Sequence, residues 1–372
     1  MEYQYYEFQA LDRRLTQEEQ TELRRLSSRA NVTPNHAIYT YSYGDFRGDP
    51  ENILAQYFDA LLHVTNWGNC QLAFRFPTAL LDRSTILPYC TFESVSITRR
   101  GEYWLLNINI MDETGGSGNW IEGEGKLSAL VPLRQSILQG DLRCLYLAWL
   151  KAATVEGDEE IDGEMFEPPV PPNLHQLTPE LETFIELFEI DEDLLSVVVE
   201  ASPALEGTDE DFVAAIETLS EEERKQWLLR LAQGEPNLRF HLLKRLRERT
   251  SAAEPQRSPT RRRLDHLLRL ATQRRKARKL AERQAEEQAR LKRLEQIAAT
   301  EESMWANVMT LIEEKQIKSY DEAIKLLKDL SELAAHQGKL TEFNARVRAI
   351  AAQYRTRPGL ISRLQSARLL PL

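Results

Sequence analysis

The residues that could bind a metal ion or attack a substrate are scattered along the sequence. The six histidines never occur three or four positions apart, and the three cysteines form no Cys-x-x-Cys pair. A zinc site of the common type needs such neighbouring ligands, and the Gly-x-Ser-x-Gly motif of a serine nucleophile is missing as well. The sequence therefore predicts no catalytic residue, no metal site and no cofactor.

One loop carries the best candidates for a pocket. Residues 43–50 read Tyr-Gly-Asp-Phe-Arg-Gly-Asp-Pro between a predicted strand and a predicted helix, and Asn-Trp-Gly follows at 66–68. Asp45, Asp49 and Trp67 could form a small polar pocket or a groove for a partner, and the hypothesis of an enzyme depends on this pocket. The favoured interpretation is that the aspartates are turn and cap residues and that Trp67 belongs to the core.

Positive charge is concentrated in residues 257–296. Fourteen lysines and arginines stand there against five acidic residues, which gives the segment a net charge of +9 in a chain of −11. The rest of the chain therefore carries −20. Eight of the basic residues are the candidates for binding an anion or an acidic partner: Arg261, Arg262, Arg263, Arg274, Arg275, Lys276, Arg278 and Lys279.

Negative charge is concentrated just before this segment. No lysine or arginine occurs in the 72 residues between Lys151 and Arg224. The basic segment could therefore bind nucleic-acid phosphates, an acidic partner or the chain's own acidic region. Opposite charges attract over a screening length of about 8 Å at physiological salt, so docking within the chain competes with external anions. The lack of aromatic residues among the basic ones disfavours recognition of single strands by stacking.

The elements that position these residues predict an α+β fold at the N-terminus. Within residues 1–155, strand patterns alternate with helix patterns, so we expect a small sheet covered by helices. A Thr-x-x-Glu capping box at Thr16 begins the first helix. Asp49 begins a second helix, whose apolar stripe is expected to continue to Leu62. Trp149 is expected in the core of this domain, as is Trp67.

The remaining regions are predicted to be mostly α-helical. Residues 156–173 are expected to be an acidic, proline-rich linker, followed by an acidic helical domain over 174–250 and a second linker over 251–260. Residues 261–298 contain neither glycine nor proline and predict one long basic helix, which would connect the regions on either side. Residues 299–372 predict a compact helical unit.

Composition excludes further classes of protein. The sequence has no run of about 20 apolar residues that could cross a bilayer, and its start does not resemble a secretory signal. Three widely spaced cysteines, Cys70, Cys90 and Cys144, do not suit a disulfide-stabilised fold. These features predict a cytoplasmic protein without a membrane partner.

Several short motifs resemble those of a family of uncharacterised bacterial proteins, over roughly the N-terminal 200 residues. They are Tyr43-x-Gly-Asp-Phe-x-Gly-Asp-Pro50, Tyr57-Phe58-Asp59-Ala60, Asn66-Trp67-Gly68, Asp141-Leu142-Arg143 and Pro168–Pro172. That family has no assigned activity, so the resemblance implies no functional residue.

The C-terminal motifs Tyr320-Asp321-x-Ala323, Phe343-x-x-Arg346 and Arg357-Pro358 are similar to helical tails of bacterial SWIM zinc-finger proteins. The cysteine–histidine signature of those proteins is missing from this sequence. The second resemblance therefore implies a setting in nucleic-acid biology without a zinc site.

Together these observations predict a cytoplasmic, non-enzymatic protein-interaction or adaptor protein. It would use the basic connector helix and the acidic helical region to bind a protein partner. The alternative is a nucleic-acid-associated factor that holds phosphates through the basic helix over residues 261–293. Neither a membrane nor a metal is an expected partner.

Overall fold

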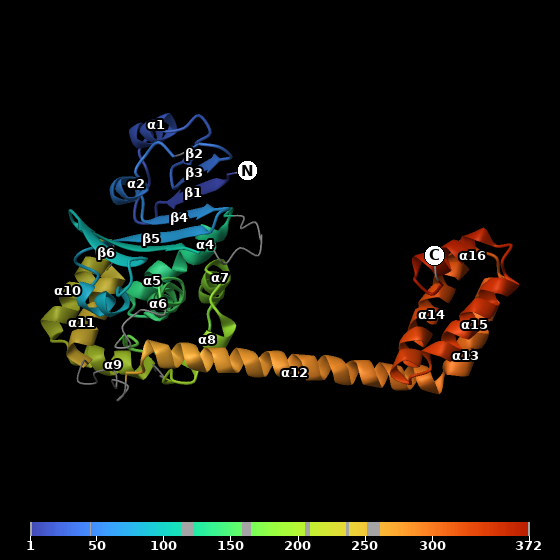
Figure 1. Cartoon of the computed structure of the whole chain (residues 1–372). Coiled ribbons are helices and arrows are strands. Elements are labelled where there is room, and N and C mark those ends of the chain that lie inside the picture. Colours follow the sequence, from blue (N-terminus) through green and yellow to red (C-terminus); the bar gives the residue numbers. More distant parts are fainter. Residues whose placement is uncertain are drawn as a thin grey trace. The chain divides into compact units, whose positions relative to one another are not determined.

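The chain folds into two compact units, Met1–Arg274 and Arg275–Leu372, which we call unit 1 and unit 2. The computed structural model describes residues 2–44, 46–112, 123–157, 165–204, 209–235, 238–250 and 261–370, without the side chains of 209–212, 244 and 247–250. Figure 1 shows the elements of each unit, which are described separately below.

Unit 1 is built on a seven-stranded antiparallel sheet with the strand order β2-β3-β1-β4-β5-β7-β6. The strands are β1 Gln4–Gln9, β2 Asn31–Thr33, β3 His36–Tyr41, β4 Ala60–Thr65, β5 Asn69–Pro77, β6 Val95–Arg100 and β7 Tyr103–Met111. Side chains alternate between the two faces of each strand. In this register Tyr6 lies opposite Tyr39 on one neighbour and His63 on the other.

Helices cover both faces of the sheet. α1 (Gln17–Arg25) and α2 (Pro50–Tyr57) pack on one face, in a core that includes Phe8 and Tyr39. The short helices α3 (Arg83–Ile86) and η1 (Leu87–Tyr89) join α4 (Lys126–Leu130), α5 (Pro132–Leu138) and α6 (Arg143–Val155) in the core of the other face. This arrangement confirms the predicted α+β fold of the N-terminal part.

Local signals in the sequence gave mixed results. The predicted capping box is present, since the Thr16 side chain accepts from the amide of Glu19 and the Glu19 side chain accepts from that of Thr16. The expectation that the second helix continues to Leu62 is wrong, because the chain leaves the helix after Tyr57 and forms β4 from Ala60. All six residues of β4 are buried. A strand that is apolar on both faces cannot be told from a helix by periodicity alone.

The acidic region does not form a domain separate from the sheet, which differs from the predicted boundaries. Its helices are α7 Pro179–Leu187, α8 Glu192–Val199, α9 Asp209–Glu217, α10 Glu221–Ala232 and α11 Leu238–Thr250. Phe184 of α7 and Val198 of α8 lie in the same core as Trp149 of α6. Of the predicted linker 156–173, Glu167, Pro168 and Pro171 are buried. The apolar residues of α7 and α8 therefore complete the core around Trp149, whereas Ala215, Leu219 and Leu246 form a separate small core among α9, α10 and α11. The predicted linker 251–260 lies outside the described residues.

A single 36-residue helix, α12 (Leu264–Ala299), begins in unit 1 and ends in unit 2. Leu264, Leu267 and Ala271 belong to the core of unit 1, whereas Leu294 and Ile297 belong to the core of unit 2. A helix over the predicted residues is thus present, and its role as a connector stays a prediction.

Unit 2 continues with four helices: α13 Glu301–Glu313, α14 Ile317–His336, α15 Leu340–Gln353 and α16 Pro358–Ser366. Their core includes Trp305, Leu327, Val347 and Leu360. The C-terminal part is therefore helical, as the sequence predicts. In the described ranges, no helix combines the length and the apolar character that a membrane crossing requires.

Candidate functional site: charged anchors and an apolar groove

The loop over residues 43–50, the candidate for a pocket, has a structural role where it is described, and for Asp49 this is the favoured cap interpretation. Asp49 caps α2, because its Oδ1 accepts from the backbone amides of Glu51 at 3.0 Å and Asn52 at 3.2 Å. Asp45 lies outside the described residues. Trp67 is 39% exposed, so the expectation that it belongs to the core is wrong. Trp67 lies in the short turn between β4, which ends at Thr65, and β5, which begins at Asn69. It is therefore outside the two buried strands.

A stack of three rings lies beside this loop on the face of α1 and α2. The ring of Tyr6 stacks on Phe46 at 4.8 Å and on His63 at 3.9 Å between centroids. Burial lowers the pKa of His63 from 6.5 to about 4, so the imidazole is neutral at pH 7. His63 Nε2 has no hydrogen-bond partner in the described structure and is shielded from solvent. Since no substrate can reach it, His63 stabilises the stack and is not placed as a base.

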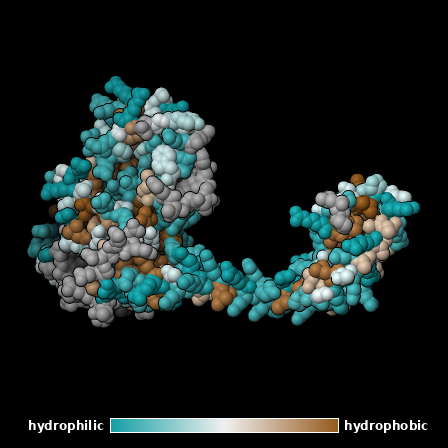
Figure 2. Space-filling model, viewed as in Figure 1, coloured by the Kyte–Doolittle hydropathy of each residue, from teal (hydrophilic) through white to brown (hydrophobic). Residues whose placement is uncertain are grey.

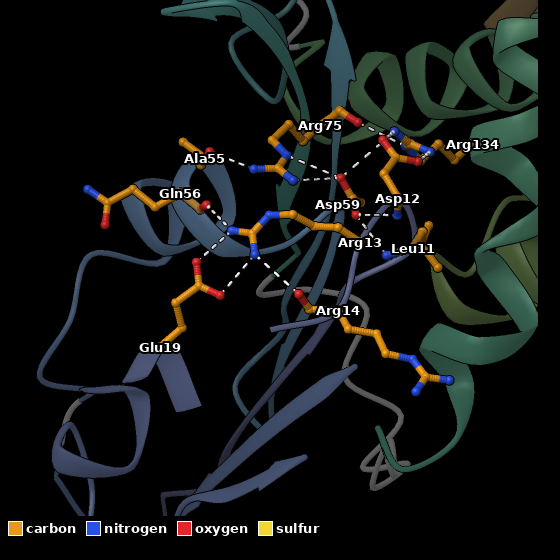
Figure 3. Close-up of polar contacts among 10 residues, drawn as sticks. All are labelled: Leu11, Asp12, Arg13, Arg14, Glu19, Ala55, Gln56, Asp59, Arg75 and Arg134. Carbon is orange, nitrogen blue, oxygen red and sulfur yellow. Dashed lines mark hydrogen bonds and ion pairs between the residues drawn. The ribbon is translucent and has the colours of Figure 1, made fainter. Parts of the chain in front are cut away.

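A largely buried cluster of two aspartates and two arginines lies at the opposite end of β4 (Figure 3). Asp59 Oδ1 accepts from Arg75 Nη2 at 2.8 Å, and Asp59 Oδ2 accepts from the backbone amides of Leu11 and Asp12 at 2.7 and 2.9 Å. Arg134 donates to both carboxylate oxygens of Asp12, at 3.0 and 2.7 Å. Asp59, Arg75 and Arg134 are all buried.

This cluster is a structural clamp. Burial raises the pKa of Asp59, but Arg75, the amide of Asp12 and Arg134 lower it more, so the net pKa is below its ordinary value. The charges are matched and Asp59 accepts through both oxygens, so no carboxylate is left to take a proton from a substrate. The cluster could not be predicted from the sequence, because Arg134 and Asp12 are 122 positions apart.

A second buried charge anchors the start of α12. Glu167 accepts from Arg262 Nε at 2.7 Å and Arg262 Nη2 at 2.6 Å, and the Tyr146 hydroxyl also donates to it. Burial and the Glu167 carboxylate raise the pKa of Tyr146 far above its ordinary value, so this hydroxyl keeps its proton. The backbone joins as well, since the amide of Glu167 donates to the carbonyl of Arg262 at 2.9 Å. One of the eight basic candidates is therefore already bound to the acidic region of its own chain.

Arg274 contacts the same acidic region from the next turns of α12. It donates to Ser196 Oγ at 2.9 Å and forms an ion pair with Glu200. The other six basic candidate residues do not come together in one site. Arg263 pairs with its neighbour Asp265 at 3.4 Å, and Arg278 pairs with Glu282 one turn further on. Arg261, Arg275, Lys276 and Lys279 are exposed.

An apolar opening lies between α9, α10 and α11, within the predicted acidic helical region. It is a groove of about 420 Å³. Its apolar lining comes from all three helices and the turn after α9: Ile216, Leu219, Trp227, Leu228, Leu231, Leu238 and Leu242. In the view of Figure 2, apolar side chains reach the surface on the side of unit 1 where Figure 1 places α10 and α11. We call this opening the α10 groove.

Among the described residues, no three His, Cys, Asp or Glu side chains gather as a metal site requires. Known protein families, curated proteins and solved structures were compared with the chain, and none of them matches it. The resemblances suggested by the sequence motifs therefore stay predictions.

Proposed function

We propose that the chain is a non-enzymatic protein-interaction protein and that the α10 groove holds a protein partner. The exposure of α10 carries this proposal. None of its twelve residues is buried, and Leu228, Leu229 and Leu231 are 66%, 58% and 65% exposed. Soluble monomers rarely expose contiguous apolar patches larger than a few hundred Å², and such large patches are typical of interaction sites. Most helical stability comes from tertiary packing, so a partner would complete the packing of α10.

The charged anchors of α12 support the same proposal over the nucleic-acid alternative. Arg262 and Arg274 are engaged by Glu167 and Glu200, so two of the predicted phosphate contacts are already used within the chain. The alternative keeps the four exposed candidates Arg261, Arg275, Lys276 and Lys279. We also propose a cytoplasmic location, which the free thiols of Cys70, Cys90 and Cys144 support.

Affinity capture tests the proposed function. The full chain and the variant Leu228→Glu/Leu231→Glu would be used as baits in cell extract, with quantitative mass spectrometry of the captured proteins. The matched control is Leu280→Glu, which changes a 57% exposed leucine on α12. We expect the groove variant to lose a defined set of proteins by about tenfold or more, the effect of about 1.4 kcal/mol of binding free energy. Equal capture by all three chains, with folding intact by circular dichroism, would contradict the proposal.

A further inference from the structure

We infer that the occupant of the α10 groove is an amphipathic helix of a partner protein, with acidic side chains flanking its apolar stripe. This inference rests on the proposed function and adds the chemistry of the partner. The α10 groove has an apolar floor, and its two charged lining residues, Arg224 and Arg239, are both arginines. Both side chains are exposed. The groove therefore combines apolar contact with positive charge at its rim.

These two arginines differ from the other basic residues around them. Lys225 pairs with Glu221 at 3.0 Å, Arg245 with Glu223 at 2.8 Å, and Arg230 with Glu235 at 2.5 Å. In the part of the chain that the structure describes, neither Arg224 nor Arg239 has an acidic partner. Arginine forms its strongest contacts with carboxylates, in paired hydrogen bonds. The acidic groups that complete the charge balance at this rim would therefore come from the ligand.

The extent of the apolar surface favours a helix over a small apolar molecule. The exposed leucines of α10 include Leu229, which does not line the groove, and Val213 of α9 is also 58% exposed. A compound that filled the groove would leave this surrounding surface in water. A helix lying along the groove would place side chains at positions i, i+4 and i+7 in it and cover the surroundings.

A second copy of the chain suits the groove less well. The acidic residues of α10 are already engaged, Glu221 and Glu222 by Lys225 and Glu223 by Arg245. A separate partner helix can bring carboxylates that are not already engaged.

Two synthetic helices test the inference with the full chain. Each has about 18 residues, roughly five turns, with leucines along one stripe. One carries glutamates beside the stripe and the other carries lysines at the same positions. Binding would be measured by fluorescence anisotropy to the unmodified chain and to Arg224→Glu/Arg239→Glu. The matched control, Arg348→Glu/Arg355→Glu, changes the net charge equally at two exposed arginines of unit 2.

We expect the acidic helix to bind the unmodified chain and the control alike, and to bind the groove variant about tenfold more weakly. The basic helix should show the reverse preference and bind the groove variant better. If the acidic and the basic helix bound the unmodified chain with equal affinity, the inference that the partner helix is acidic would be wrong. If neither helix binds while capture from extract still depends on Leu228 and Leu231, the partner class is wrong and the proposed function stands. A dimer in light scattering that Leu228→Glu/Leu231→Glu dissociates would make a second copy the occupant.

Discussion

His63 couples the stability of unit 1 to pH. Burial holds its folded pKa at about 4, whereas the unfolded chain takes up the proton near 6.5. Between these two values the unfolded state binds more protons, so stability falls as the pH is lowered from 6.5 to 4. The loss approaches about 3 kcal/mol at the lower end, at about 1.4 kcal/mol per pKa unit.

The variant His63→Gln should lose this part of the pH dependence. We expect urea unfolding to give a smaller drop in stability between pH 7 and pH 4.5 for the variant than for the unmodified chain. His175→Gln, at an exposed position, is the control and should keep the full drop. The same pH dependence in all three chains would show that His63 is accessible to protons in the folded state.

Asp59 gives a second prediction for a single residue. Asp59→Asn removes the charge that faces buried Arg75, and we expect it to destabilise unit 1 by about 3–5 kcal/mol in urea unfolding. Glu19→Gln breaks a partly exposed pair with Arg13 but still offers an oxygen to the Thr16 amide, and it should cost less than about 1 kcal/mol. Because the folded pKa of Asp59 is lowered, its contribution is present above the ordinary pKa of 3.8 and is lost as the pH falls through the folded value. A cost for Asp59→Asn as small as that of Glu19→Gln would contradict the clamp.

These residues also show which side-chain interactions can be predicted from the sequence. The Thr16–Glu19 capping box could be predicted because both partners lie within one helical turn and the bonding pattern is local. The Asp59 clamp could not, because its arginines come from β5 and α5 and meet Asp59 only after the sheet has formed. The charge of Asp59 does not show which of the many arginines far away in the sequence will pair with it.

At the level of the elements, the anchoring of the start of α12 depends on the ion pair between Glu167 and Arg262. Arg262→Met leaves Glu167 buried without its counter-charge, and we expect a loss of about 3–5 kcal/mol in the stability of unit 1. Adding Glu167→Gln to Arg262→Met should recover part of that loss, since the buried charge is then gone. Chemical denaturation of the three variants measures the coupling. Strictly additive effects would mean that the pair contributes nothing to anchoring α12.

The sequence predicts that a segment is helical more readily than it predicts what packs against that helix. The absence of glycine and proline predicts α12, since propensity decides over so long a run. The α10 groove was not predicted, because leucines at helical spacing look the same whether they face a core or a partner. Only the placement of α9 and α11 shows that Leu228 and Leu231 remain at the surface.

For the whole molecule, the two units should unfold as separate cooperative transitions in calorimetry. Trp149→Ala removes a fully buried ring from unit 1, and Trp305→Ala removes one from the core of unit 2. Each change should cost about 3–5 kcal/mol and shift only the transition of its own unit. Trp67→Ala, at an exposed position, is the control and should move neither transition by a comparable amount. A single transition that both core variants shift equally would contradict the division into two units.

The pairing of Glu167 with Arg262 also sets an order of events on the ribosome. The two residues are 95 positions apart, so at about 5–20 residues per second the arginine is added about 5–20 s after the glutamate. During that interval the strands and α6 have already been synthesised, while residues 165–167 lack their backbone partners at 262–264. The nascent chain must keep this segment in water until the first turn of α12 leaves the exit tunnel. The contact between residues 165–167 and residues 262–264 therefore forms late in translation. A chain that stopped before residue 261 would fold without this contact.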